Sequence, residues 1–313
     1  MLSRLKKLMP PSGNGHPGGM VFNMSYGIQG ECRYAHVPVM LDLAGVPYTG
    51  SGPRGHSICL DKVVTKTLLE RAGVPTPRFR SLSSPSERVH GLRYPLVVKP
   101  RYESTSNGLE LVRDRAGLKR AVEFIVTQYS QDALVEEYIP GREVAVSLLG
   151  NDPPEVLPLV EFDFGDRPIK MMTRPDKFHK TLDEPTKICP ASLSPALTAQ
   201  IKEIALAVFH LCQVRDYARI DLRIDPEGNP SVLEVNSMAS LGRGGAYVLS
   251  AKVAGYKFDD LVTRIVDVAH LRYFGSPATR DRDSRPEIPA RPLPGDAAEI
   301  IDPAAVPPGP RTA

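Results

Sequence analysis

The chain has 313 residues, of which 42% are hydrophobic and 24% are charged, proportions typical of a water-soluble globular protein. Lys and Arg total 39 against 36 Asp and Glu, and the net charge of +3 is too balanced for a protein that binds nucleic acid or anionic membranes through a basic face. No apolar run approaches the roughly 20 residues that span a bilayer, so no membrane partner is expected. The four cysteines have no C-x-x-C spacing, which argues against a zinc site or a disulfide framework and predicts buried free thiols in a cytoplasmic protein.

The first half of the chain alternates predicted strands and helices. Ser57 is expected to cap a helix that runs to Ala72, because a Ser side chain accepts hydrogen bonds from the first N–H groups of a helix and Gly73 follows as a stop. The other elements predicted there are strands at 20–24, 94–99, 109–112 and 133–139, and helices at 36–44 and 118–129.

The second half continues this mixture, so the expected fold class is α/β or α+β with mixed sheets. Its predicted elements are strands at 142–149 and 156–164, a polar loop at 166–187, a helix at 195–212 capped by Ser194, a hairpin of 217–225 with 230–236, and a helix at 258–273. A 20-residue loop inside a compact domain indicates either a functional lid or an error in the assignment. Residues 276–313 are rich in proline and charge, and we expect them to be disordered.

The hairpin carries the most informative residues. Arg219, Asp221 and Arg223 alternate with apolar residues and share one face of their strand, while Glu234 and Asn236 share one face of the next, with Leu233 and Val235 on the other. If the turn is centred on residues 227–228, opposing residue numbers sum to 455, and Asp221 faces Glu234.

Two carboxylates placed directly opposite each other repel unless a cation lies between them. Asp221, Glu234 and Asn236 offer hard oxygen ligands, which suit Mg²⁺ completed by phosphate and water. The residues alone leave a second interpretation open, in which this is a solvated hairpin face with alternating charges.

Three further segments are candidates for nucleotide contacts. Lys62 lies on a helix and Lys99 ends an apolar strand, although exposed lysines are usually only solvated. The loop 103–108, with Thr105 and Ser106, offers hydroxyl and N–H groups to phosphate, but it is not a P-loop. The sequence Glu136-Glu137-Tyr138-Ile139 is either an edge strand or a hinge that offers backbone groups to adenine and carboxylates to ribose.

Taken in order, these segments resemble the D-alanine–D-alanine ligase branch of the ATP-grasp superfamily over about residues 20–275. The resemblance rests on VFNMSYG…G at 21–30, GVPYTGSG at 45–52, LDKVVTKTLLERAGVPTP at 60–77, YPLVVKP, LVEEYIPGRE, ARIDLRID and LEVN. It implies an ATP-grasp fold of two α+β subdomains enclosing ATP, preceded by a partial Rossmann-like domain. The implied domains are a remnant of that first domain at 1–56, a central subdomain at 57–140, a C-terminal subdomain with the metal site at 141–275 and the tail at 276–313.

The resemblance also implies roles for individual residues. It assigns the ATP phosphates to Lys62 and Lys99, adenine to the hinge at 136–139, ribose to Glu143, and phosphate to Lys177 of the long loop with Lys180 as the alternative. It assigns two Mg²⁺ (or Mn²⁺) ions to Asp221, Glu234 and Asn236, and stabilisation of the transferred phosphate to Arg219. The implied activity joins two small amino acids through an acyl phosphate, by default D-alanine for peptidoglycan and the cell wall, in a cytoplasmic enzyme that forms a homodimer.

The sequence departs from the family pattern at both substrate ends. Only 20 residues precede Val21, so we expect either a misassigned start or a truncation that affects the donor site. Gly245 stands where the family has an acceptor-binding serine, and Tyr26 stands where it usually has a histidine. Arg243 is the alternative ligand for an acceptor carboxylate. The rival functions are therefore ligation of another amino-acid pair in specialised metabolism and nucleotide binding by a pseudoenzyme without a donor site.

Overall fold

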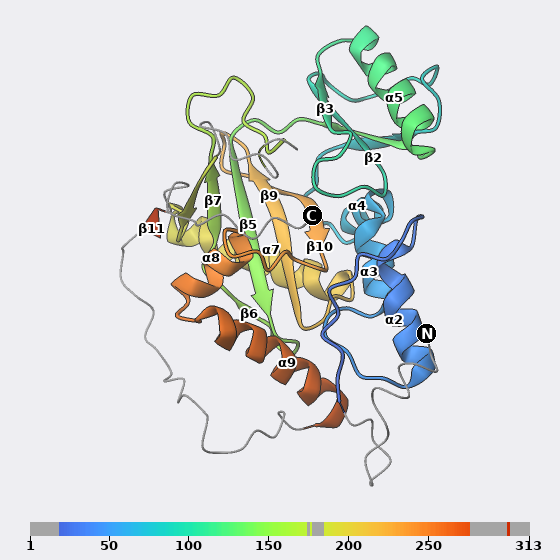
Figure 1. Cartoon of the computed structure of the whole chain (residues 1–313). Coiled ribbons are helices and arrows are strands. Elements are labelled where there is room, and N and C mark those ends of the chain that lie inside the picture. Colours follow the sequence, from blue (N-terminus) through green and yellow to red (C-terminus); the bar gives the residue numbers. More distant parts are fainter. Residues whose placement is uncertain (1–18, 174–175, 177–184, 276–298, 301–313) are drawn as a thin grey trace, which may run out of the picture.

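A computed structural model describes residues 19–173, 176, 185–275 and 299–300. Two separate β-sheets organise the chain, a four-stranded sheet and a seven-stranded one (Figure 1). This is the mixed α+β architecture that the alternation of elements predicts. In the described part of the chain, no helix is both long enough and apolar enough to cross a membrane.

The small sheet has the strand order β1-β4-β2-β3, and all its paired strands are antiparallel. The strands are β1 (Phe79–Leu82), β2 (Leu96–Pro100), β3 (Glu110–Val112) and β4 (Ala133–Glu137). Helix α5 (Arg115–Tyr129) covers one face, where Leu96, Val98 and Val135 pack against its apolar stripe. Because side chains alternate along a strand, Lys99 and Glu136 point away from α5.

The large sheet has the order β10-β9-β5-β7-β8-β11, with β6 paired to β5. Its strands are β5 (Arg142–Leu149), β6 (Glu155–Val156), β7 (Val160–Asp163), β8 (Thr186–Cys189), β9 (Tyr217–Ile224), β10 (Pro230–Asn236) and β11 (Glu299–Ile300). Helix α7 (Pro195–Leu211) packs against Ile220 and Leu222 on one face. Helices α8 (Ala246–Val253) and α9 (Phe258–Phe274) cover part of the opposite face (Figure 1). The rest of that opposite face borders a cavity, and the small sheet lies on the other side of that cavity.

The N-terminal part is mainly helical and corrects two predictions. It contains η1 (Arg33–Ala35), α2 (His36–Ala44), α3 (Pro53–Leu60) and α4 (Lys62–Arg71). The strand expected at 20–24 is reduced to a single bridge between Val21 and Tyr48. The helix expected from Ser57 is two helices, and Asp61 rather than Ser57 caps α4 by accepting from the N–H groups of Val63 and Val64. Ser57 lies inside α3, whose N-cap is Gly52, and the carboxylate of Asp61 also forms an ion pair with Arg101.

The hairpin places Asp221 opposite Glu234 and Arg219 opposite Asn236, as expected, although the strand register near the turn differs from the expected one. Next to the turn the pairs are Pro230 with Ile224 and Val232 with Leu222, one residue away from the expected register. A bulge between Val232 and Glu234 then shifts the register by one. The expectation that Leu233 faces the core is therefore wrong, because Val232 packs in the core and Leu233 lines a cavity.

Further differences concern short elements. The expected strand 156–164 is broken between β6 and β7, where Pro158 has no N–H to donate to a ladder. The expected loop 166–187 ends in β8, and β1 and α8 were not predicted. Cys32 is exposed rather than buried, whereas Cys59, Cys189 and Cys212 are buried free thiols as expected. Of the tail expected to be disordered, only β11 is described, and it pairs with β8; the rest lies outside the described residues.

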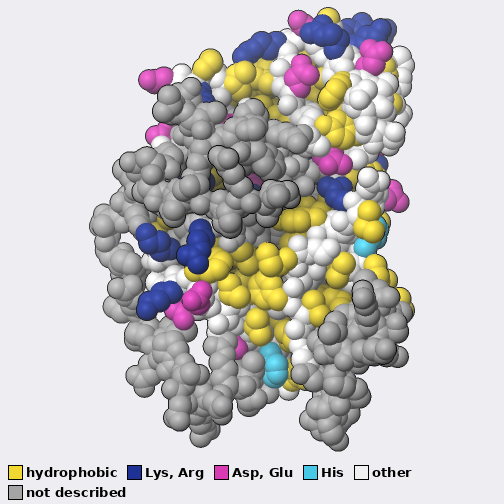
Figure 2. Space-filling view, in the orientation of Figure 1, with side chains coloured by type: hydrophobic (Ala, Val, Ile, Leu, Met, Phe, Trp, Pro, Cys, Tyr) yellow, Lys and Arg dark blue, Asp and Glu magenta, His cyan; other side chains and the backbone are white. Residues whose placement is uncertain are grey.

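Charged side chains of both signs lie on the face of the molecule seen in Figure 2. Figure 2 shows Lys and Arg together with Asp and Glu around the end of the molecule that carries the small sheet. Among the described residues seen in this view, positive and negative side chains are mixed, as the nearly equal numbers of basic and acidic residues predict.

Candidate active site

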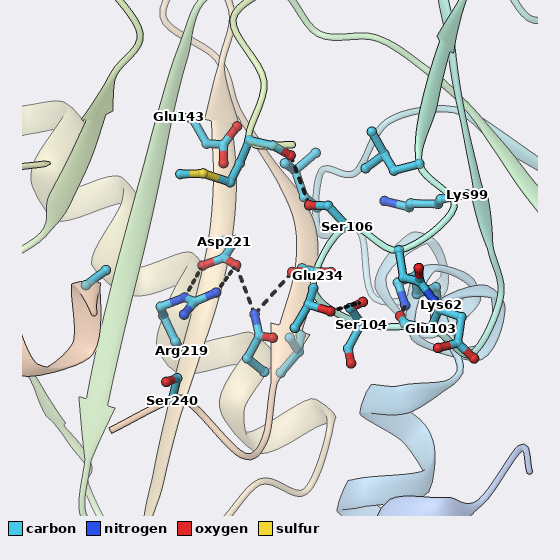
Figure 3. Close-up of a pocket in the computed structure, with 18 of the residues that line it drawn as sticks. Lys62, Lys99, Glu103, Ser104, Ser106, Glu143, Arg219, Asp221, Glu234 and Ser240 are labelled. Carbon is cyan, nitrogen blue, oxygen red and sulfur yellow. Dashed lines mark hydrogen bonds and ion pairs between the residues drawn. The ribbon is translucent and has the colours of Figure 1, made fainter. Parts of the chain in front are cut away.

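A cavity of about 830 Å³ lies between the two sheets. Its walls come from β2, β4 and the loop after β2 on the small-sheet side, and from β5, β9 and β10 on the large-sheet side. Figure 3 shows Lys62 and Lys99 on one side of this cavity, and Arg219, Asp221 and Glu143 on the strands of the other side. Buried lysines thus face Arg219 and several carboxylates across a space large enough for a nucleotide.

All but one of the predicted site residues line this single cavity. They are Lys62, Lys99, Thr105, Ser106, Glu136, Glu137, Tyr138, Ile139, Glu143, Arg219, Asp221, Glu234 and Asn236. The exception is Lys177, which, like Lys180, lies outside the described residues. The fold therefore gathers residues from segments that are separate in the sequence, while their individual roles stay predictions.

Lys99 belongs to a buried charge cluster that the sequence did not reveal. Its Nζ donates to Glu136 Oε1 at 2.5 Å, and Lys66 Nζ lies 2.8 Å from the other carboxylate oxygen. Burial opposes charge on both Glu136 and Lys99, but the opposite charges outweigh it, so the pKa of Glu136 is lowered and that of Lys99 is raised. Burial lowers the pKa of Lys66. Lys66 follows Lys62 by one helical turn, and this spacing was the signal that could have identified it.

Lys62 is the first residue of α4, directly after the Asp61 cap. Its Nζ donates to the backbone carbonyl of Glu103, at the start of the loop 103–108. Burial lowers the pKa of Lys62 to about 8, even though the nearby carboxylate of Glu234 acts to raise it. This lysine is therefore partly deprotonated slightly above neutral pH, when no ligand anion is present.

The loop 103–108 follows β2 and borders the cavity. Thr105 and Ser106 have left-handed backbone conformations with φ of 59° and 55°, which is strained for residues other than glycine. Ser106 Oγ donates to the Met172 carbonyl at 2.9 Å, which connects the loop to the segment before residue 174. A strained loop that borders a cavity beside a buried lysine is a candidate for anion binding.

The acidic pair of the hairpin is held by hydrogen bonds from two neighbours. Arg219 binds Asp221 through both oxygens, at 2.6 and 2.7 Å, and Asn236 Nδ2 donates to Asp221 at 2.9 Å and to Glu234 at 3.4 Å. The pKa of Arg219 is raised because the Asp221 carboxylate outweighs the effect of burial. The carboxylates are therefore kept together by cationic and amide donors.

The chain crosses from the small sheet to the large sheet through the hinge 138–141, between β4 and β5. Tyr138 N–H donates to the Pro95 carbonyl, and Glu137 accepts from the N–H of Arg93. The Glu143 carboxylate, expected to bind ribose, accepts a hydrogen bond at 3.0 Å from Arg223, a residue for which no functional role was expected.

The cavity end beyond Arg219 has a different lining. Ser240 and the glycine-rich stretch 242–245 border it, and Tyr26 and Tyr34 also line the cavity. Arg243 also lines the cavity, and its guanidinium carbon lies 4.9 Å from the centre of the Phe258 ring. This contact places a cation at the cavity wall on an apolar support.

A family model described as the D-ala D-ala ligase C-terminus matches residues 68–267. An uncharacterized protein of Sinorhizobium fredii, y4sG, is 51% identical over 276 residues, covering 88% of this chain and 82% of that protein. A D-alanine–D-alanine ligase of Pelotomaculum thermopropionicum is 32% identical over 248 residues, covering 74% of each chain.

Solved structures of D-alanine–D-alanine ligases also resemble this chain in fold. A D-alanine–D-alanine ligase from Bacillus anthracis complexed with ATP matches with a TM-score of 0.65 and 25% identity, over 79% of this chain and 77% of that one. The D-alanine–D-alanine ligase of Coxiella burnetii matches in fold with a TM-score of 0.68 at 24% identity, over 82% of this chain and 69% of that one.

Proposed function

Since this chain belongs to the D-ala D-ala ligase C-terminus family, an ATP-grasp family, we propose that it is an ATP-dependent ligase that joins the carboxylate of one amino acid to the amine of another. The observation that carries the proposal is the single cavity between the two sheets, with buried lysines on one wall and the Arg219, Asp221 and Glu234 cluster on the other. The fold alone would not support an activity, because one fold hosts many functions.

The nucleotide occupies the part of the cavity between the hinge and the lysines. The related Bacillus anthracis ligase was solved with ATP, which supports a nucleotide here. Lys62, Lys99, Thr105 and Ser106 bind the phosphates, residues 136–139 bind the base, and Glu143 binds the ribose. Lys177 stays a prediction, as does the homodimer.

The residues Asp221, Glu234 and Asn236 fit a Mg²⁺ or Mn²⁺ ion by the chemistry of their donor atoms. Two carboxylates and a side-chain amide supply hard oxygens, and the amides of Asn and Gln present oxygen and nitrogen with nearly the same shape. Among the described residues, no group of three or more His, Cys, Asp or Glu side chains could hold a metal ion, so a site here would need the amide oxygen of Asn236 beside the two carboxylates. When bound, such an ion neutralises the charge on phosphate oxygens.

The reaction requires positioning and charge neutralisation rather than a protein nucleophile. A carboxylate oxygen of the first amino acid attacks the γ-phosphorus and ADP leaves, which forms an acyl phosphate. The amine of the second amino acid then attacks the acyl carbon, loses a proton, and expels inorganic phosphate. The Arg219 guanidinium faces the site of both transfers and stabilises the negative charge that develops on oxygen.

Arg243 binds the carboxylate of the second amino acid. Three arginines of the described chain line the cavity, and two of them pair with carboxylates, Arg219 with Asp221 and Arg223 with Glu143. Arg243 forms no ion pair with another described residue, which leaves it for an anionic substrate group. A guanidinium can bind a carboxylate through two parallel hydrogen bonds.

Which amino acids are joined is a separate question from whether ligation occurs. D-Alanine as the substrate is suggested by D-alanine–D-alanine ligases that are 32–33% identical to this chain. The relative that is 51% identical is uncharacterized. Arg243 and the glycine at position 245 favour testing other amino-acid pairs beside D-alanine.

The test is phosphate release by the full chain with ATP, Mg²⁺ and a panel of D- and L-amino acids, alone and in pairs. We expect release that depends on a particular pair and is lost in Glu234→Gln, which excludes a contaminating ATPase. ATP binding without phosphate release for any pair would reject the ligase and support the pseudoenzyme.

A further inference from the structure

Arg223 is a buried cation at the nucleotide end of the cavity. It lies on β9, two residues after Asp221, and is only 3% exposed. A buried guanidinium is costly unless its donors are satisfied by hydrogen bonds. Its partners therefore indicate why the site keeps it.

These partners all belong to the segments around the hinge. Arg223 Nε donates to the Ile139 carbonyl at 2.6 Å, and Nη2 donates to the Gly141 carbonyl at 2.9 Å. Nη1 donates to the Glu143 carboxylate at 3.0 Å and to the Lys170 carbonyl at 2.6 Å. Nη2 also lies 3.4 Å from the Tyr138 hydroxyl, and the guanidinium stacks over that ring at 5.0 Å.

One side chain thus connects two stretches of the chain that are separate in the sequence. These are residues 138–143, which form the hinge and the start of β5, and the segment near Lys170. The hinge approaches β9 closely, since a Cβ atom on Gly141 would lie 2.2 Å from the Ile224 carbonyl oxygen. Arg223, Tyr138, Ile139 and Glu143 all line the cavity, so these contacts shape the wall that a base and ribose would meet.

We propose that Arg223 is a positioning residue for the nucleotide, which fixes the hinge carbonyls and the Glu143 carboxylate in the arrangement that binds the base and ribose. This inference rests on the proposed ATP-dependent function. Lysine cannot replace Arg223, because an ammonium lacks the planar fork that reaches several acceptors at once.

The test is calorimetric binding of ATP and of 2′-deoxy-ATP to the full chain, with Mg²⁺ and without amino acids, so that no turnover occurs. For Arg223→Lys we expect about tenfold weaker ATP binding, which corresponds to losing one or two charge-assisted hydrogen bonds. The wild type should bind ATP about tenfold more tightly than 2′-deoxy-ATP, and the variant should lose most of that preference.

The matched control is Arg142→Lys on the neighbouring strand β5. Arg142 pairs with Glu161 and the Ser192 carbonyl and does not line the cavity, so its variant should keep both affinities within about twofold. A general effect on folding would change both variants alike, and it would leave the ratio of the two nucleotides unchanged.

The outcomes separate the two proposals. A wild type that binds no ATP rejects the proposed function itself. A wild type that binds ATP but does not distinguish 2′-deoxy-ATP, or a folded Arg223→Lys with wild-type affinities, rejects the role of Arg223. If Arg223→Lys does not fold, Tyr138→Phe decides, because it removes only the hydroxyl between Arg223 and the Lys170 carbonyl; unchanged affinity and selectivity in that variant would also reject the role.

Discussion

Three lysines near the site are buried to a degree that is rare for this residue. Lys66 is fully buried, and Lys62 and Lys99 are each 8% exposed. Only Lys66 and Lys99 share a carboxylate, that of Glu136, whereas Lys62 Nζ is bonded to a backbone carbonyl. At Lys62 burial outweighs the nearby carboxylate of Glu234, which makes the charge of this lysine depend on pH near neutrality.

The lowered pKa of Lys62 predicts a pH dependence of nucleotide binding. The side chain is charged below its pKa of about 8 and loses its charge as the pH rises through that value. ATP binding without amino acids should therefore weaken about tenfold from pH 7 to pH 9, in calorimetric titrations. Lys62→Arg keeps its charge over this range and should give a flat profile. A flat profile in the wild type would contradict this prediction, because it requires both the lowered pKa of Lys62 and its contact with the phosphates.

The charge cluster around Glu136 predicts a large effect on stability. Glu136→Gln leaves Lys66 and Lys99 without their shared anion, and should lower the free energy of unfolding by about 3 kcal/mol in urea titrations. The neighbouring Glu137 pairs with Arg78 and Arg93, which are largely exposed, so Glu137→Gln should cost less than about 1 kcal/mol. Equal losses in the two variants would contradict the buried network.

At the scale of elements, the hairpin and the hinge bring the site together. The expected pairing of Asp221 with Glu234 is confirmed, yet two departures from the expected register cancel to produce it. The turn is shifted by one residue, and the bulge near Leu233 shifts the strand back. Alternation of polar and apolar residues identifies the faces of a strand, but it does not locate a bulge, because one inserted residue changes the register only beyond it.

A substitution at Gly141 would test how closely the hinge approaches β9. Its φ of 112° is unfavourable for other residues, and an alanine Cβ would overlap the Ile224 carbonyl oxygen. Gly228, in the hairpin turn, has a φ of 90° and open space where a Cβ would lie, so it isolates the conformational cost of about 1 kcal/mol. Gly141→Ala should cost about 2 kcal/mol more than Gly228→Ala in chemical unfolding. Similar costs would mean that the hinge moves away from β9 without penalty.

At the scale of the molecule, Asp216 joins the N-terminal part to the large sheet and to α9. Its fully buried carboxylate accepts from the Gly50 N–H at 2.7 Å, from Asn151 at 2.9 Å, and from Arg272 of α9 at 2.9 and 3.0 Å. Arg272 also donates to the Tyr48 carbonyl at 3.0 Å. The segment before α3 is therefore held against the large sheet and α9 by a buried ion pair, whose two residues lie far from that segment in the sequence.

Asp216→Asn removes the charge of this anchor and keeps its shape. It should lower the free energy of unfolding by about 3 kcal/mol, because Arg272 loses the carboxylate that pairs with it while both groups stay largely buried. Asp259→Asn, in the exposed first turn of α9, should cost less than about 1 kcal/mol. Unfolding monitored by circular dichroism measures both, and a loss below 1 kcal/mol at Asp216 would argue against the anchor.

Local chemistry along the chain is enough to predict many of the elements, and ordered motifs are enough to identify the family. Ser194 and Pro195 begin α7 and Gly45 ends α2, because capping and stop signals act over a few residues. The same motifs identified thirteen residues that line one cavity. The domain boundaries and the roles of these residues stay predictions.

Contacts between groups far apart in the sequence became visible only in the folded chain. Lys66 and Glu136 are 70 positions apart and Arg223 and Ile139 are 84 apart, so no local pattern signals their contact. Asp61, and not Ser57, caps α4, and Arg101, on another segment, pairs with its carboxylate. The physical reason is the same in each case: a buried charge is stable only where folding supplies its partners, and those partners come from elements that are distant along the chain.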